Sequence, residues 1–170
     1  LLRKHLKQHP TDVAAIRMLA EVAARLGRYA DSESLLVRCL ELAPGFTAAR
    51  QNYAHVLHRQ NRTHEALTIV EKLLAADPKN PSLLAAKASY LARLGDFDRS
   101  IALYGNVLQL YPNQARLHMS YGHALKTAGR QAESIDAYRR CIELAPHVGE
   151  AYWSLANLKT VRFDDRDVAA

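Results

Sequence analysis

The sequence predicts an all-α protein, a right-handed superhelical solenoid of 34-residue antiparallel helix hairpins. Five prolines recur every 34 residues (44 minus 10, 78 minus 44 and so on), at Pro10, Pro44, Pro78, Pro112 and Pro146. Two sets of small residues and one set of turn residues recur at the same interval. We call residues that lie 34 positions, or a multiple of 34, apart a column. A fixed period of this length marks an array of repeated supersecondary units.

The small columns predict that the two helices of each hairpin approach closely. A large side chain at such a position would hold the helices apart. The column on the first helix consists of Ala20, Ala54, Ala88, Gly122 and Ala156. The column on the second helix consists of Ser32, Ala66, Ser100 and Ser134. We expect these two columns to face each other.

A turn column lies between them, at Gly27, Asn61, Gly95 and Gly129. These residue types accept the left-handed conformation that ends a helix. The proline column follows each second helix, which a proline cannot extend. The expected helix pairs are 13–26 with 30–42, 47–60 with 63–76, 81–94 with 97–110 and 115–128 with 131–144, followed by a single helix at 149–160.

The pattern therefore predicts one domain over 1–170. Its full repeats are repeat 1 (13–46), repeat 2 (47–80), repeat 3 (81–114) and repeat 4 (115–148). Residues 1–12 are expected to end a truncated repeat, and 149–161 to form the first helix of a fifth. Residues 162–170 are expected to begin a linker to a further domain.

Residues 1–160 resemble tetratricopeptide repeats, both in these columns and in motifs such as Leu94-Gly95-Asp96-Phe97. The stretches 120–130 and 149–163 more narrowly resemble the last repeat and connecting helix of bacterial proteins in which such repeats precede a sulfotransferase domain. The resemblance implies a scaffold that binds a protein or peptide in a concave groove and recruits partners for the sulfotransferase. The alternative is a free-standing adaptor with no enzymatic neighbour.

The first helices are expected to line the groove. The candidate partner-binding residues are Arg17, Arg25, Gln51, His55, Arg59, Ser89, Arg93, Met119, His123, Lys126, Trp153 and Asn157. Arg25, Arg59 and Arg93 form a column that suits an acidic partner. Plain solubility explains this column more simply, because two charges about 10 Å apart repel by only ~0.4 kcal/mol in water and are easily tolerated. Trp153 could likewise anchor a ligand or pack against a following domain.

No catalytic residue, cofactor or metal is expected in this chain. None of its 7 glycines begins a Gly-Lys or Gly-Ser/Thr pair of the kind that a phosphate loop requires. His55 and His58 lie three residues apart, but no carboxylate or thiolate accompanies them at ligand spacing. We expect both to be solvated groove residues.

Composition narrows the partners further. The net charge of +6 admits an acidic protein, nucleic acid or anionic lipid. Nucleic acid is not expected, since only 7% of residues are aromatic and most fall in core columns. No apolar run approaches the ~18 residues of a membrane span. Cys39 and Cys141 share a column and should be buried thiols, which suits a reducing cytoplasm.

We predict weak, concentration-dependent end-to-end association of this chain, lost when a downstream domain is present. The uncovered apolar side chains are expected to be Leu1, Leu2 and Leu6 at one end and Tyr152, Leu155 and Leu158 at the other, because the helix that would cover them is missing. Burying ~300 Å² at each end returns about 7 kcal/mol, against an association cost of about 4–15 kcal/mol. Sedimentation should detect it. A strict monomer up to millimolar concentration contradicts the prediction, and a tight dimer through the concave face would also contradict the placing of the groove.

Overall fold

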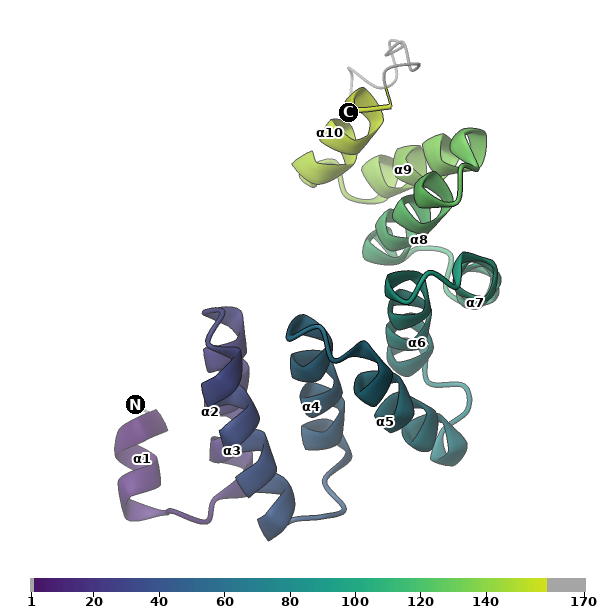
Figure 1. Cartoon of the computed structure of the whole chain (residues 1–170). Helices are drawn as coiled ribbons and strands as arrows, with labels where there is room; N and C mark the ends of the chain where they lie inside the picture. Colours follow the sequence, from purple (N-terminus) through teal and green to yellow (C-terminus); the bar gives the residue numbers. More distant parts are fainter. Residues whose placement is uncertain (1, 159–170) are drawn as a thin grey trace. The chain divides into compact units, whose positions relative to one another are not determined.

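The computed structural model describes residues 2–158, which consist of α-helices joined by short turns (Figure 1). No strand occurs within this range. The helices are α1 (Leu2–Gln8), α2 (Val13–Arg25), α3 (Tyr29–Leu42), α4 (Thr47–Arg59), α5 (Thr63–Ala76), α6 (Pro81–Arg93), α7 (Phe97–Leu110), α8 (Ala115–Thr127), α9 (Gln131–Leu144) and α10 (Gly149–Ala156). Their type and order confirm the predicted all-α fold. No helix in the described part of the chain is long and apolar enough to cross a membrane.

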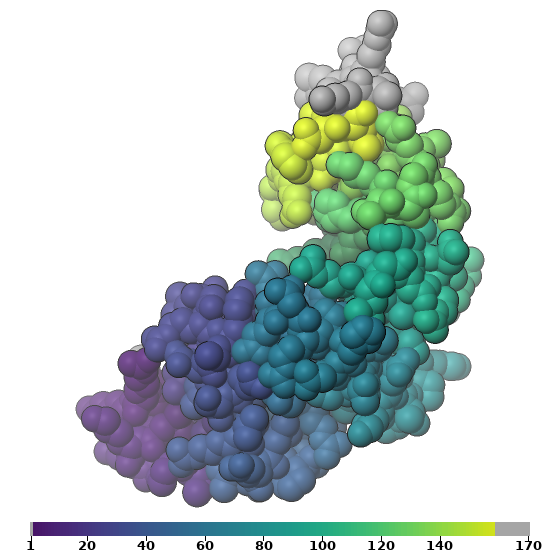
Figure 2. All heavy atoms as spheres, in the orientation of Figure 1, coloured from purple at the N-terminus to yellow at the C-terminus, as the bar shows by residue number. Residues whose placement is uncertain are grey.

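The chain divides into two compact units, Leu1–Ala86 and Lys87–Ala170, with the division inside α6. In unit 1, α2 packs on α3, α4 packs on α5, and α3 contacts α4. In unit 2, α8 packs on α9, with α7 and α10 on either side of this pair. Within unit 1 the side chains fill the spaces that the ribbons leave between α2, α3 and α4 (Figure 2).

The four predicted turns adopt the left-handed conformation. Gly27, Gly95 and Gly129 have φ of 73°, 86° and 80°, and Asn61 has φ of 65°. In each turn the next residue donates its N–H to a carbonyl of the last helical turn, as in Arg28 to Ala23 at 2.9 Å. The bonds from Arg62 to Leu57, Asp96 to Leu91 and Arg130 to Leu125 are also 2.9 Å long. This pattern satisfies carbonyls that the helix end would otherwise leave unpaired.

Polar side chains fix where several helices begin. Asp12 accepts a hydrogen bond from the N–H of Ala15 at 3.0 Å and so caps α2. Asn80 Oδ1 accepts from the N–H groups of Ser82 and Leu83 at 3.1 and 3.2 Å at the start of α6. Such caps pair donors that have no partner within the helix, and each contributes about 1 kcal/mol.

The small columns of the two helices face each other, as predicted. Ala20 and Ala88 are completely buried. Across the hairpin, Ser32 Oγ donates to the Ala20 carbonyl at 2.8 Å, and Ser100 Oγ donates to the Ala88 carbonyl at 2.7 Å. The serine hydroxyl therefore does more than save space, because it ties the two backbones together.

Repeat 4 makes a different use of the same column. A Cβ atom at Gly122 would lie 2.6 Å from Cε1 of Tyr138, which is fully buried. Glycine is required here because the tyrosine ring occupies the space that an alanine methyl would take. Burial raises the pKa of Tyr138 to about 12.

The chain ends differ from the prediction in part. α1 forms as expected, and Leu6 packs against the core that contains Ile16 and Leu36. α10, in contrast, ends at Ala156 rather than near residue 160. The N–H of Leu158 bonds to Leu155 at 3.0 Å, which tightens the last turn out of α-helical geometry. Ala156 is exposed, because no described helix covers it. The expectation that Leu155 is uncovered is wrong, because α10 packs on α9 and buries Leu155 completely in the cluster with Tyr138. The rest of the predicted helix and the 162–170 linker lie outside the described residues.

Ala88→Leu should destabilise the protein by about 1–3 kcal/mol or more, because a larger side chain at this fully buried position forces α6 and α7 apart where Ser100 bonds to the Ala88 carbonyl. Ala102→Leu is the matched control, since Ala102 is an exposed residue of α7. Thermal and urea unfolding should show a clear loss of stability for Ala88→Leu and none for Ala102→Leu. An unchanged melting temperature for Ala88→Leu would overturn the repeat register.

Candidate functional site

Five of the predicted partner-binding residues lie on the first helices of unit 1. Arg17 and Arg25 belong to α2, and Gln51, His55 and Arg59 belong to α4. The two helices contact each other, so these residues occupy adjoining surfaces. Arg25, His55 and Arg59 are exposed, whereas Arg17 and Gln51 are half-buried. We call this set of five the α2–α4 surface.

Glu21 organises the arginines of α2. Its carboxylate lies 2.7 Å from Arg25 Nη2 and 3.4 Å from Arg17 Nη1. One carboxylate facing two guanidinium groups leaves a net positive charge on this helix. On α4, Arg59 donates to the Tyr29 hydroxyl at 2.9 Å, with its guanidinium 5.4 Å from the ring centroid. The cations are thus held in place, but are not neutralised.

The histidines of α4 add no metal site. Although part of the His55 side chain is open to solvent, the surrounding protein atoms desolvate its ring, and this effect, followed by the charge of Arg59, lowers the pKa of His55, so the ring is neutral at pH 7. His58 Nδ1 lies 3.2 Å from the hydroxyl of Thr63. Within residues 2–158, no three His, Cys, Asp or Glu side chains gather closely enough to hold a metal ion.

Asn52 carries a signal that sequence reasoning missed, because no ladder of asparagines accompanies it along the repeats. Its Nδ2 atom is buried and has no hydrogen-bond partner among the described residues. It lies on α4 three residues before His55 and seven before Arg59, which places the three on one helix face. Leaving such a donor unpaired costs about 1–3 kcal/mol, and an unpaired group in a native structure calls for an explanation.

Unit 2 carries the remaining candidates on α6, on α8 and in or just after α10. They are Ser89, Arg93, Met119, His123, Lys126, Trp153 and Asn157. Arg93, Lys126 and Asn157 are exposed, and Trp153 exposes 65% of its surface. Ser89 and His123 are half-buried.

The prediction that Met119 lines the partner-binding surface is wrong. Met119 is only 7% exposed and packs in a core cluster with Tyr138, Cys141 and Leu155. The same column holds the exposed Trp153 and the half-buried Arg17. Met119 is buried because its apolar side chain meets apolar residues of α9 and α10, whereas those two side chains remain at the surface.

His123 links three helices of unit 2. Its Nδ1 lies 3.0 Å from the Tyr138 hydroxyl, and its Nε2 lies 3.5 Å from Glu150 Oε1. A carboxylate, an imidazole and a phenol in series resemble an acid–base relay. Tyr138, however, is fully buried with a raised pKa, so its hydroxyl stays protonated and out of reach of a substrate. The chain of contacts holds α10 against α8 and α9.

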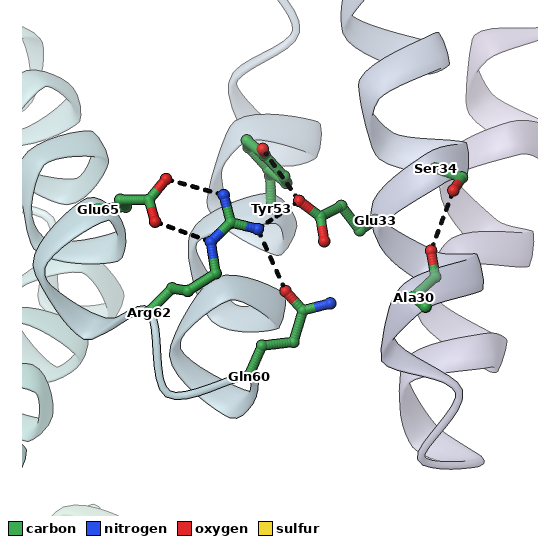
Figure 3. Close-up of polar contacts among 7 residues, drawn as sticks. All are labelled: Ala30, Glu33, Ser34, Tyr53, Gln60, Arg62 and Glu65. Carbon is green, nitrogen blue, oxygen red and sulfur yellow. Dashed lines mark hydrogen bonds and ion pairs between the residues drawn. The ribbon is translucent and has the colours of Figure 1, made fainter.

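A second polar cluster joins the hairpins of repeats 1 and 2 (Figure 3). Arg62 binds Glu65 through two parallel contacts of 2.7 and 2.8 Å, and its Nη1 lies 2.6 Å from Glu33. Tyr53 also donates to Glu33 at 3.4 Å. Arg62 follows the α4–α5 turn, and its guanidinium reaches across to Glu33 of α3. Bidentate geometry favours a structural role for this cluster.

The cysteines are buried thiols, as predicted. Burial raises the pKa of both Cys39 and Cys141. Cys39 also donates to the Val13 carbonyl at 3.3 Å. Both thiols therefore remain protonated and unreactive in the folded state.

Comparison with known proteins agrees with this architecture. Two tetratricopeptide repeat profiles match, one over residues 23–90 and one over 85–157. The Cell division cycle protein 27 homolog A of Arabidopsis thaliana is 26% identical over 99 residues, which is 58% of this chain. The aligned region spans only 14% of that relative's length.

Solved structures show the same fold. A thermophilic tetratricopeptide repeat protein of Thermus thermophilus superposes with a TM-score of 0.82 at 18% identity, over 94% of this chain and 88% of its own. YrrB, described as having an unusual peptide-binding site, superposes with a TM-score of 0.64 at 16% identity, over 99% of this chain and 88% of its own.

The Arg62 cluster predicts a pH dependence of stability. Burial tends to raise the pKa of Glu33, but hydrogen bonds from Arg62, Gln60 and Tyr53 outweigh it and lower the pKa. The resulting stabilisation is present above the ordinary carboxyl pKa and is lost as the pH falls through the lowered one. Glu33→Gln should cost about 1 kcal/mol at pH 7.

Urea unfolding of Glu33→Gln and the unmodified chain should give free energies that converge in acid. Glu143→Gln is the control, because Glu143 pairs with Arg140 on an exposed helix face, 2.8 Å away. Glu143→Gln should lose close to no unfolding free energy. A constant difference between Glu33→Gln and the unmodified chain down to about pH 2, well below the ordinary carboxyl pKa, would show that the charge of Glu33 is not what stabilises the contact.

Proposed function

Because the chain belongs to the tetratricopeptide repeat family, we propose that it is a scaffold that binds an extended segment of a partner protein across the α2–α4 surface. The single observation that carries this proposal is the buried, unpaired Nδ2 of Asn52 on the same helix face as the exposed Arg59. Asn52 as a whole is only half-buried, so a turn of its amide about χ2 would bring Nδ2 to the surface, where a backbone carbonyl of an extended peptide can accept the hydrogen bond that it lacks. A hydrogen bond from Asn52 to the bound peptide would therefore recover the free energy that the unpaired donor costs in the free protein.

The charges of this surface favour an acidic segment. Arg17, Arg25 and Arg59 outnumber Glu21, and their guanidinium groups are already oriented by hydrogen bonds and a ring contact. Orientation before binding lowers the entropy that the complex must give up. Opposite charge on the partner would raise the association rate and help to fix its register.

Support also comes from a structural neighbour, since YrrB has a peptide-binding site on the same fold. At 16% identity this likeness concerns the fold alone. The residues that recognise a ligand in this chain must therefore be argued from its own surface, as above.

The narrower resemblance of 120–130 and 149–163 carries a finer proposal. We propose on that basis that the scaffold recruits acceptor substrates or partners for a sulfotransferase domain in the bacterial cytoplasm. The alternative is an adaptor with no enzymatic neighbour. The coding sequence that follows Ala170 separates them, because a Gly-rich phosphate loop with Lys and Ser/Thr supports the first and a stop codon supports the second.

Asn52→Ala should weaken binding of an acidic peptide pool about three- to tenfold, because one hydrogen bond to a peptide contributes about 0.5–1.5 kcal/mol. The probe is a fluorescent pool of decapeptides rich in Asp, Glu, Leu and Gly, followed by fluorescence anisotropy. Asn106→Ala, at an exposed position of α7, is the control. Arg17→Ala combined with Arg59→Ala should weaken binding further and reduce its dependence on salt.

The proposal fails if both asparagine variants bind the pool equally. It also fails if a lysine-rich pool of the same length binds as well as the acidic one. NMR chemical-shift changes of the backbone amides of α2 and α4 should show directly that the peptide binds the α2–α4 surface.

A further inference from the structure

We propose a second binding site on unit 1, outside the α2–α4 surface, that takes an acidic peptide through one apolar side chain. The site is a hollow of about 390 Å³ lined by Leu40, Arg50, Tyr53, Ile69, Lys72 and Leu73. These residues come from α3, α4 and α5. A hollow of this volume lies at the lower end of the range of small ligand pockets, roughly 300–1,000 Å³.

At the rim of the hollow, repeat 2 departs from the repeat pattern at one residue. Arg50 shares a column with Ile16 and Leu84. In repeat 1, Ile16 is only 1% exposed and belongs to the core cluster. Arg50 is instead exposed, because burying an unpaired guanidinium is too costly. The volume that an aliphatic side chain fills in repeat 1 is therefore left open in repeat 2.

The chemistry of the lining defines the ligand. Leu40, Ile69 and Leu73 provide an apolar floor, and Arg50 and Lys72 stand on facing helices at its rim. Both cations are exposed, and neither forms a hydrogen bond or ion pair with any residue in 2–158. An apolar floor below two available cations is complementary to an apolar side chain flanked by carboxylates.

Repeat 4 contains a natural comparison. Two periods further along, His118, Tyr121, Ala137 and Arg140 line a hollow of about 300 Å³ at the same four columns as Arg50, Tyr53, Ile69 and Lys72. Its polar groups are already engaged. Arg140 pairs with Glu143 and also donates to Asn113, and His118 Nε2 lies 2.8 Å from the Pro112 carbonyl.

Glu133 and Asp136 also line the repeat 4 hollow, where they would repel an acidic ligand. The specificity that we propose therefore distinguishes the hollow of repeat 2 from that of repeat 4. It depends on Arg50 and Lys72 and not on the repeat architecture that the two hollows share.

The test uses the capped pentapeptide Glu-Glu-Phe-Glu-Glu and the chain labelled at its Ile, Leu and Val methyl groups. Titration followed by methyl NMR should give saturable chemical-shift changes at the methyl groups of Ile69 and Leu73. The uncharged peptide Gln-Gln-Phe-Gln-Gln should bind about tenfold more weakly, and Lys72→Ala should weaken the acidic peptide about threefold. Arg50→Leu should abolish these shifts, because it restores the aliphatic side chain that fills the space in repeat 1.

Three controls separate this site from the rest of the molecule. Asn52→Ala should leave the shifts at Ile69 unchanged, so the two binding surfaces can fail independently. Arg140→Ala, the column equivalent of Lys72→Ala, should have no effect. Circular dichroism should show that Arg50→Leu is fully folded.

Equal affinity for the acidic and uncharged peptides would overturn the proposal, as would shifts confined to α2 and the α2–α4 surface. Full binding by folded Arg50→Leu would overturn it as well.

Discussion

The contact between the two helices of a hairpin is the constraint on which the rest of this structure depends. It requires a residue no larger than alanine or serine at each crossing, and in repeats 1 and 3 a serine hydroxyl bonds to the opposite backbone. This bond keeps a polar group paired inside the core, where an unpaired one would be costly. The first helices can present a surface only because this contact fixes their spacing from the second helices.

Contacts between hairpins build on that spacing, and here the repeats differ. Repeats 1 and 2 are joined by a charged cluster centred on Arg62, whereas α10 is held on repeat 4 by His123 and the buried core around Tyr138. Binding surfaces arise where packing leaves a side chain uncovered. A single column can therefore supply a core residue in one repeat and an exposed residue in another, as Met119 and Trp153 show.

Periodicity was sufficient to predict what depends on one residue type at one position. The left-handed turn at Asn61 and the buried positions of Ala88 and Ser100 are of this kind. Sequence reasoning failed where the outcome depends on neighbours from other helices. Met119 is buried by residues of α9 and α10, and the unpaired amide of Asn52 becomes visible only once all its surroundings are placed. The hollow beside Arg50 likewise reflects the absence of a side chain, and no motif records it.

The position of the two cysteines has a practical consequence for measuring how the molecule opens. The chain has 2 cysteines, and they fall one in each compact unit, Cys39 in the first and Cys141 in the second. Both are completely buried thiols with a raised pKa, so a thiol reagent can reach either one only after its hairpin has opened. The rate of alkylation at each site thus reports the local unfolding of its own unit. The two halves of the repeat array can be followed separately without introducing any label.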